Sequence, residues 1–155
     1  MFASYSLCAA RLADIEAIDY FFVRELTGLV ESSNETDFCL LLALSRAQRM
    51  GNSCLIVSEL AGEHCFAHSD EPDSGFIFAH QDELLFRAEA LVKHPGMAGR
   101  LHWYNGRLYT ARYWQFEQQL VASIAERSNP APLTNEQTEA LLQVWPSLFP
   151  VQRNL

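Results

Sequence analysis

The stretch that decides the fold is RLHWYNGRLYTARYWQFE, residues 100–117. Asn105-Gly106 lies at its centre, and this dipeptide is typical of a two-residue hairpin turn, because both central positions of a type I′ turn require φ > 0. The residues on either side are rich in aromatic side chains and threonine, which strands favour. The sequence therefore predicts a β-hairpin in which Tyr104 pairs with Arg107 across the turn.

Alternation along the two strands gives this hairpin two faces. One face is expected to join the core, and it consists of Leu101, Trp103, Leu108 and Thr110. The other face consists of His102, Tyr104, Arg107, Tyr109 and Tyr113. Because an isolated hairpin is marginally stable, we expect the helix that follows from about Trp114 to support it.

The composition is that of an ordinary globular chain. Of its 155 residues, 49% are hydrophobic and 19% are charged, and the formal net charge is −8. The length predicts a single domain with a substantial core. The negative charge argues against general binding to nucleic acid or to anionic membranes, since both reward excess positive charge.

The cysteines and the N-terminus predict a cytoplasmic protein. The four cysteines are scattered without a CxxC motif, which is typical of buried thiols in a reducing compartment. No signal peptide is expected, because charged residues from Arg11 onward follow too short an apolar start. The longest apolar run, residues 38–44, is too short to cross a membrane.

Helical periodicity predicts a mainly α fold (α+β) with about five helices and the hairpin in the C-terminal half. The predicted helices span residues 11–30, 36–50, 81–93, 114–127 and 134–144. The inward positions of the first are expected to be Leu12, Ile15, Ile18, Phe22, Leu26 and Leu29. A short buried strand at 54–57 and a loop at 62–75 complete the prediction. Helices, a strand and a late hairpin are compatible with a winged-helix-like arrangement.

Motifs for catalysis are missing from the sequence. A phosphate-binding loop needs a lysine directly after glycine, whereas the single lysine, Lys93, follows Val92. The GxSxG and HExxH motifs are also absent. We therefore predict no catalytic residue and no cofactor. His64, Cys65 and His68 have metal-ligand chemistry, but they fall in the predicted loop; a small metal-dependent enzyme is the rival interpretation.

A basic and aromatic region runs from Lys93 to Tyr113, with four cationic residues and no acid. Three interpretations stay open: the aromatic residues pack in the core while the arginines pair with acids of neighbouring helices, the region forms a protein interface, or it stacks the bases of single-stranded nucleic acid. The candidate interface residues are Arg100, Trp103, Tyr104, Arg107, Tyr109 and Arg112.

Four ordered segments carry a resemblance to a known family. Residues 106–117, GRLYTARYWQFE, are similar to the G-[D]-RLYLxRxWxxE segment in the N-terminal domain of RecD, the alpha subunit of exodeoxyribonuclease V. Residues 11–15 resemble its first helix, residues 40–60 its LAxxLLSxxxxxGHVCLPLSxL stretch, and residues 148–150 the LFP that precedes the motor. Residues 63–80 match no part of the family pattern.

The resemblance implies a non-catalytic domain, with residues 1–128 docking the subunit and residues 129–155 leading toward a motor domain. In the family the LFP is followed by the ATP loop of a 5′→3′ DNA helicase, whereas this sequence ends at Leu155. The implied partner is a RecC-like subunit, and through it a RecB-like subunit. Contact with DNA would be indirect, through a complex that processes DNA ends in double-strand-break repair by recombination.

Overall fold

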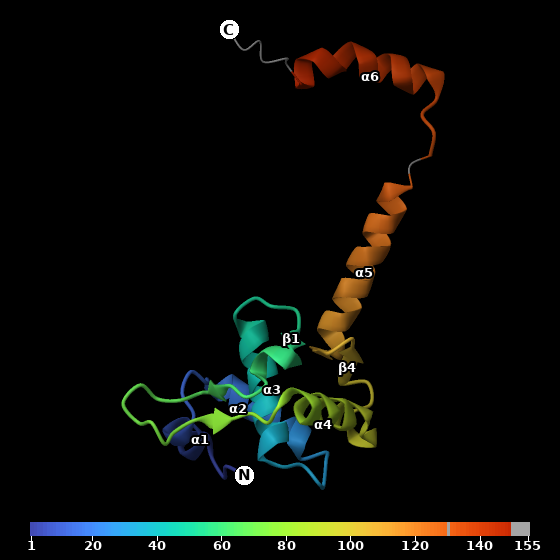
Figure 1. The fold of residues 1–155 in the computed structure, drawn as a ribbon. Coiled ribbons are helices and arrows are strands. Elements are labelled where there is room, and N and C mark those ends of the chain that lie inside the picture. Colours follow the sequence, from blue (N-terminus) through green and yellow to red (C-terminus); the bar gives the residue numbers. More distant parts are fainter. Residues whose placement is uncertain (130, 150–155) are drawn as a thin grey trace. The chain divides into compact units, whose positions relative to one another are not determined.

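The computed structural model describes residues 1–129 and 131–149, which divide into two compact units, one spanning residues 1–118 and the other beginning at Gln119. Helices dominate the part of the chain that is described (Figure 1), so the predicted mainly α class with a late β-hairpin is confirmed. The α-helices are α1 (Tyr5–Arg11), α2 (Ala17–Thr27), α3 (Glu35–Arg49), α4 (Gln81–Lys93), α5 (Ala111–Ser128) and α6 (Asn135–Leu148). The strands are β1 (Leu55–Ile56), β2 (His64–Cys65), β3 (Phe76–Ile77), β4 (Leu101–Tyr104) and β5 (Arg107–Thr110), and short 3-10 turns occupy Val57–Leu60 and Pro95–Met97.

Helix α3 is the centre of the first unit. It starts with a capping box in which the side chains of Asn34 and Asp37 each accept a backbone N–H of the other residue, so two unpaired donors of the first turn are satisfied. All seven residues from 38 to 44 are buried, because α2, α4 and β1 pack around the helix. The prediction of a central helix that is apolar on nearly every side is confirmed.

The hairpin has the predicted register. Tyr104 pairs with Arg107 and Trp103 with Leu108, and the turn residues Asn105 and Gly106 have φ values of 50° and 77°. Both values are positive, as a type I′ turn requires. Strand β1 adds to the outer edge of β5, which gives a three-stranded antiparallel sheet in the order β1-β5-β4. This order is compatible with the expected winged-helix-like arrangement.

The segment predicted as a loop at residues 62–75 contains a strand instead. Residues His64 and Cys65 form β2, which pairs with β3 in a second, two-stranded sheet. Gly75 lies against the backbone of Cys65 and Ala67 with a φ of 85°, and a Cβ atom at this position would be closer than 3 Å to both. The close approach therefore requires glycine. Strands of two residues are too short to leave a periodic signal in the sequence.

The predicted single helix over residues 11–30 is wrong, because the chain breaks between α1 and α2. Asp14 has a φ of 57°, a left-handed conformation that no continuing helix contains. The break shifts the phase of α2, so that Asp19, Tyr20 and Val23 face the core while Ile18 is 67% exposed. The prediction placed Ile18 in the core because it extended one helical periodicity through the break.

The remaining helices begin and end close to the predicted residues. Helix α4 spans the predicted residues 81–93, and a turn at His94-Pro95-Gly96 follows it. Helix α6 starts with the predicted capping box of Thr134 and Gln137, and it continues four residues beyond the predicted end. Within the described ranges, no helix is long and apolar enough to cross a membrane.

The four cysteines are free thiols. Cys8 and Cys39 are buried as predicted, whereas Cys54 and Cys65 are partly exposed. Burial raises the pKa of the Cys8 thiol to about 11 and raises that of Cys39 further. The two core thiols are thus protonated and unreactive at neutral pH.

Candidate protein interface

Trp114, at the start of α5, covers the second face of the hairpin. Its indole ring stacks on His102 with a centroid separation of 3.9 Å and an interplanar angle of 15°. The same ring packs edge-on against Tyr109, with 5.2 Å between centroids, and lies 5.4 Å from Tyr104. The expected support of the hairpin by the following helix is confirmed.

Tyr109 is consequently part of the packing and not of the surface. Only 4% of it is exposed. Burial raises the pKa of its phenol, and the neighbouring Cys54 and Glu117 raise it further. Tyr109 was predicted from the sequence to be a candidate interface residue on an open face of the hairpin. Its packing beneath Trp114 corrects this prediction. The alternation of side chains along a strand shows which residues share a face, but it does not show what covers that face.

The other candidate residues are spread over the hairpin and its flanks. Trp103 is partly buried and packs against the core, whereas Tyr104 is 55% exposed. Arg100 and Arg112 are exposed and Arg107 is partly exposed. Among the described residues, no ion pair joins any of these three arginines to an acid. The interpretation in which they brace neighbouring helices is therefore not supported.

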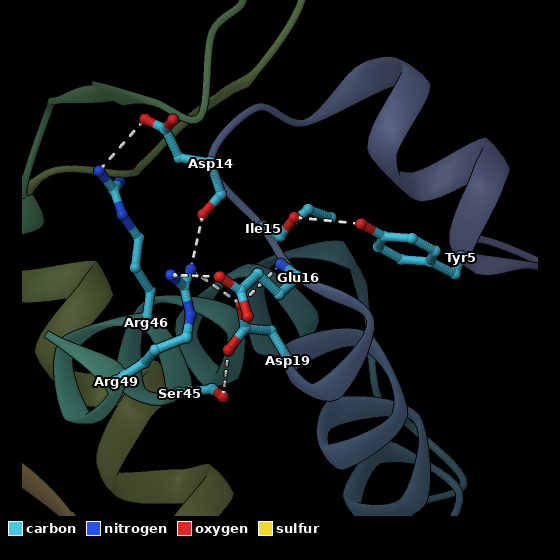
Figure 2. Close-up of polar contacts among 8 residues, drawn as sticks. All are labelled: Tyr5, Asp14, Ile15, Glu16, Asp19, Ser45, Arg46 and Arg49. Atoms are coloured by element: carbon cyan, nitrogen blue, oxygen red, sulfur yellow. Dashed lines mark hydrogen bonds and ion pairs between the residues drawn. The ribbon is translucent and has the colours of Figure 1, made fainter.

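A polar network ties the start of α2 to the end of α3 (Figure 2). The carboxylate of Asp19 has no exposed surface. It accepts hydrogen bonds from the Ser45 hydroxyl at 2.7 Å, the Glu16 backbone N–H at 2.8 Å and the Arg49 guanidinium at 3.1 Å. A buried charge is tolerated only when it is paired and hydrogen-bonded in this way.

Arg49 extends the network to the break before α2. Its guanidinium donates to the carbonyl of Asp14 at 3.0 Å and pairs with Glu16 at 3.2 Å, as the dashed lines in Figure 2 show. The hydrogen bond to Asp19 is the main cause that raises the pKa of Arg49. Arg46 adds an ion pair to Asp14 at 3.3 Å. The network thereby holds both the break and the orientation of α2.

A groove of about 660 Å³ opens between α2, α3 and the junction of β5 with α5. The amide of Gln48 donates to the Thr110 hydroxyl at 3.0 Å, which ties α3 to the end of the hairpin along this groove. The groove is lined by Glu16, Ile18, Asp19, Phe22, Ser45, Gln48, Arg49, Thr110, Arg112 and Tyr113. Arg112 is the one sequence-predicted interface residue that lines it.

The groove combines an apolar wall with a cation that pairs with no acid among the residues described. Ile18 is exposed and Phe22 is partly exposed on the outward side of α2. The guanidinium of Arg112 lies over the ring of Phe116, 5.4 Å from its centroid. Sequence reasoning missed the α2 side of this site, because the outward position of Ile18 depends on the break at Asp14, which no local sequence pattern indicates.

The histidines that resembled metal ligands are engaged elsewhere. The Nε2 atom of His64 lies 2.7 Å from the Ser74 carbonyl oxygen, and that of His68 lies 2.9 Å from the Ala9 carbonyl oxygen. Each ring thus donates an N–H to the backbone. Within residues 1–129 and 131–149, no group of three or more His, Cys, Asp or Glu side chains is placed to hold a metal ion.

Comparison with known proteins gives no relative: no protein-family profile, no curated protein and no solved structure matches this chain.

Proposed function

We propose that this chain is a non-catalytic docking domain of a RecD-type subunit, which binds a RecC-like subunit of a DNA-end-processing helicase–nuclease. The four ordered segments that resemble the RecD N-terminal domain support the identity of the complex. The observation that carries the docking role is the groove beside the exposed Ile18, with Arg112 at its lining.

The groove has the chemistry of a protein–protein contact. Interface hot spots are enriched in aromatic residues and arginine around a desolvated apolar centre. Ile18, Tyr113 and Arg112 supply these groups from α2 and the start of α5. Charged residues set specificity and association rate more than affinity, so Arg112 would select the partner while the apolar wall supplies binding energy.

Binding to the RecC-like subunit of the same organism tests this function. We expect the purified chain to bind that subunit with a Kd of about 1 μM or lower, measured by calorimetry, because a standard-size interface reaches at least this affinity. The negative control is a sample of the chain that has been denatured and no longer shows the circular dichroism spectrum of the native protein. A folded chain that fails to bind at 100 μM contradicts the proposal.

Direct contact with single-stranded nucleic acid is the second candidate function. It is favoured by Arg100, Arg107 and Arg112, which have no ion-pair partner among the residues described. The aromatic residues fit it less well. Tyr109 is buried and His102 is stacked on Trp114, so Tyr104 is the only candidate aromatic residue more than half exposed.

A salt titration separates the two functions. Phosphate contacts release counterions, so a nucleic-acid site binds most tightly at low salt and its affinity falls steeply as salt rises. We expect no binding of a fluorescent single-stranded oligonucleotide at 20 mM salt. Tight binding at low salt that Arg107→Glu abolishes would favour the nucleic-acid function over docking.

A further inference from the structure

We infer that the groove between α2, α3 and the start of α5 receives an apolar side chain of the partner that is flanked by a carboxylate, and that this carboxylate pairs with Arg112. The inference rests on the proposed docking function and adds the chemistry of the partner segment. It is carried by three features of the groove: its apolar wall, the balance of its charges and the rigidity of its walls.

The apolar wall comes from residues that the fold leaves exposed or only partly buried. Ile18 is 67% exposed although the next two residues of α2, Asp19 and Tyr20, are buried. Phe22 follows one helical turn later on the same side and is partly exposed. Tyr113 closes the wall from α5. An apolar side chain that enters here removes this surface from water, which favours association.

The lining holds two acids and two arginines, and both acids pair with the same arginine. Glu16 and Asp19 both pair with Arg49, at 3.2 Å and 3.1 Å. No ion pair joins Arg112 to another described residue. A guanidinium presents a planar fork of donors that matches the two oxygens of a carboxylate. Arg112 is thus the group in the groove that is available to form an ion pair with a carboxylate of the partner.

The walls are held in place before any partner binds. The buried Asp19 fixes Arg49 against α2, and the Gln48–Thr110 hydrogen bond joins α3 to β5. The ring of Phe116 supports the Arg112 guanidinium through a cation–π contact. Preformed walls reduce the entropy lost on binding, so a short segment can bind without rearranging the groove.

The same lining disfavours a nucleic acid or a membrane surface. The side chain of Glu16 is 62% exposed in the groove that holds Arg112. A row of phosphates would be repelled by the Glu16 carboxylate while it is attracted by the Arg112 guanidinium. A partner segment with a single carboxylate beside an apolar side chain needs to contact only Arg112. The charge pattern therefore fits a protein segment with one acid next to its anchor.

Two matched pairs of variants test the inference on the complex with the RecC-like subunit. We expect Arg112→Glu to weaken binding at least tenfold and Ile18→Ser to weaken it about tenfold or more, as buried interface anchors do. The controls carry the same change outside the groove: Arg127→Glu on α5, and Ile77→Ser at a site that is 66% exposed. Their affinity should stay within about twofold of the wild type, the range of energetically near-neutral contacts.

A peptide titration provides a test that does not need the partner subunit. Acetylated and amidated Ser-Leu-Phe-Asp-Ser is added to the ¹⁵N-labelled chain, with Ser-Leu-Phe-Lys-Ser as the matched control. We expect the acidic peptide at millimolar concentration to shift the amide signals of Ile18, Phe22, Arg112 and Tyr113, and Arg112→Glu to remove these shifts.

The outcomes distinguish the inference from the function on which it rests. Wild-type binding to the RecC-like subunit that both groove variants leave unchanged would overturn the inference while the docking function stands. Failure of the wild type to bind that subunit, together with peptide shifts in the groove, would overturn the docking function alone. Equal shifts with the acidic and basic peptides would overturn the assignment of Arg112.

Discussion

Two adjacent residues on opposite sides of α2 reverse the usual distribution of polar and apolar residues. The side that faces α3 holds Asp19, a carboxylate with no exposed surface, whereas the outward side holds Ile18, an aliphatic residue that is 67% exposed. The two residues are neighbours in sequence. Burial in this helix is therefore decided by what each residue meets and not by its hydrophobicity alone.

The comparison separates a residue that serves the fold from one that is free to serve a partner. Asp19 is buried because three donors surround its carboxylate. Removing Arg49 leaves a buried charge without its ion pair, and removing either of the other donors leaves one hydrogen bond unmade. Ile18 contributes little to the core, so its exposed surface has no structural reason. A groove with an apolar wall, here Ile18 together with Phe22, is the kind of feature that marks an interaction site, whereas a single exposed apolar residue is not.

Replacing Asp19 should produce the largest effect. Asp19→Asn removes the charge and turns one acceptor into a donor that faces Arg49, Ser45 or the Glu16 N–H. We expect a loss of about 3–5 kcal/mol in the free energy of unfolding, as for other broken buried ion pairs, measured by urea denaturation. The matched change Asp14→Asn alters an acid whose side chain is 71% exposed and should cost less than about 1 kcal/mol. Equal losses would show that burial of the acid does not set its importance.

Arg49→Met should have the next largest effect. Methionine keeps the apolar stem but removes the ion pair to Asp19 and the donor to the Asp14 carbonyl. Because the side chain is 32% exposed, we expect water to replace part of these bonds and the loss to be about 2 kcal/mol. Thermal unfolding followed by circular dichroism measures it. A loss as small as that of an exposed ion pair would contradict the central position of Arg49.

Ser45→Ala should be milder. It removes one of three donors to Asp19 while the Arg49 and Glu16 bonds remain. The expected loss is about 1 kcal/mol, typical of a single hydrogen bond. Combined with Arg49→Met in a double-mutant cycle, it should show coupling, since both variants act on the same carboxylate. Strict additivity would mean that the two donors stabilise the fold independently.

Ile18→Ser should have the smallest effect on stability. A substitution on the exposed side of α2 is expected to change the free energy of unfolding by no more than about 0.5 kcal/mol. By contrast, Leu26→Ala on the buried side, where the side chain is 6% exposed, should cost about 2–5 kcal/mol. A large loss for Ile18→Ser would remove the distinction between the two sides and with it the main support for the groove as a binding site.

The features that could be predicted from the sequence are those with local causes. The register of the hairpin follows from the Asn105-Gly106 turn, and the start of α6 follows from its capping box. Helix α4 ends at His94-Pro95 because proline restricts the residue before it. Each of these signals lies within a few residues of the feature that it determines.

The features that could not be predicted depend on distant residues. The break at Asp14 is held by Arg46, and the Ala13 N–H donates to the carbonyl of Phe66 at 2.7 Å. No sequence pattern near residue 14 predicts these contacts. The groove is likewise assembled from three segments that are remote in sequence, so only its Arg112 edge lay within the region that the sequence marked as a candidate interface.

The position of β5 at the centre of the sheet has a consequence for the order of folding. One neighbour, β4, is joined to it by a two-residue turn, while the other, β1, precedes it by about 50 residues. Hairpins close in roughly 1–10 μs, whereas a distant strand must first overcome the entropy of closing a long loop. The hairpin should thus serve as the early template on which β1 docks late. Stopped-flow measurements should then find that Gly106→Ala slows refolding, while Leu55→Ala chiefly speeds unfolding.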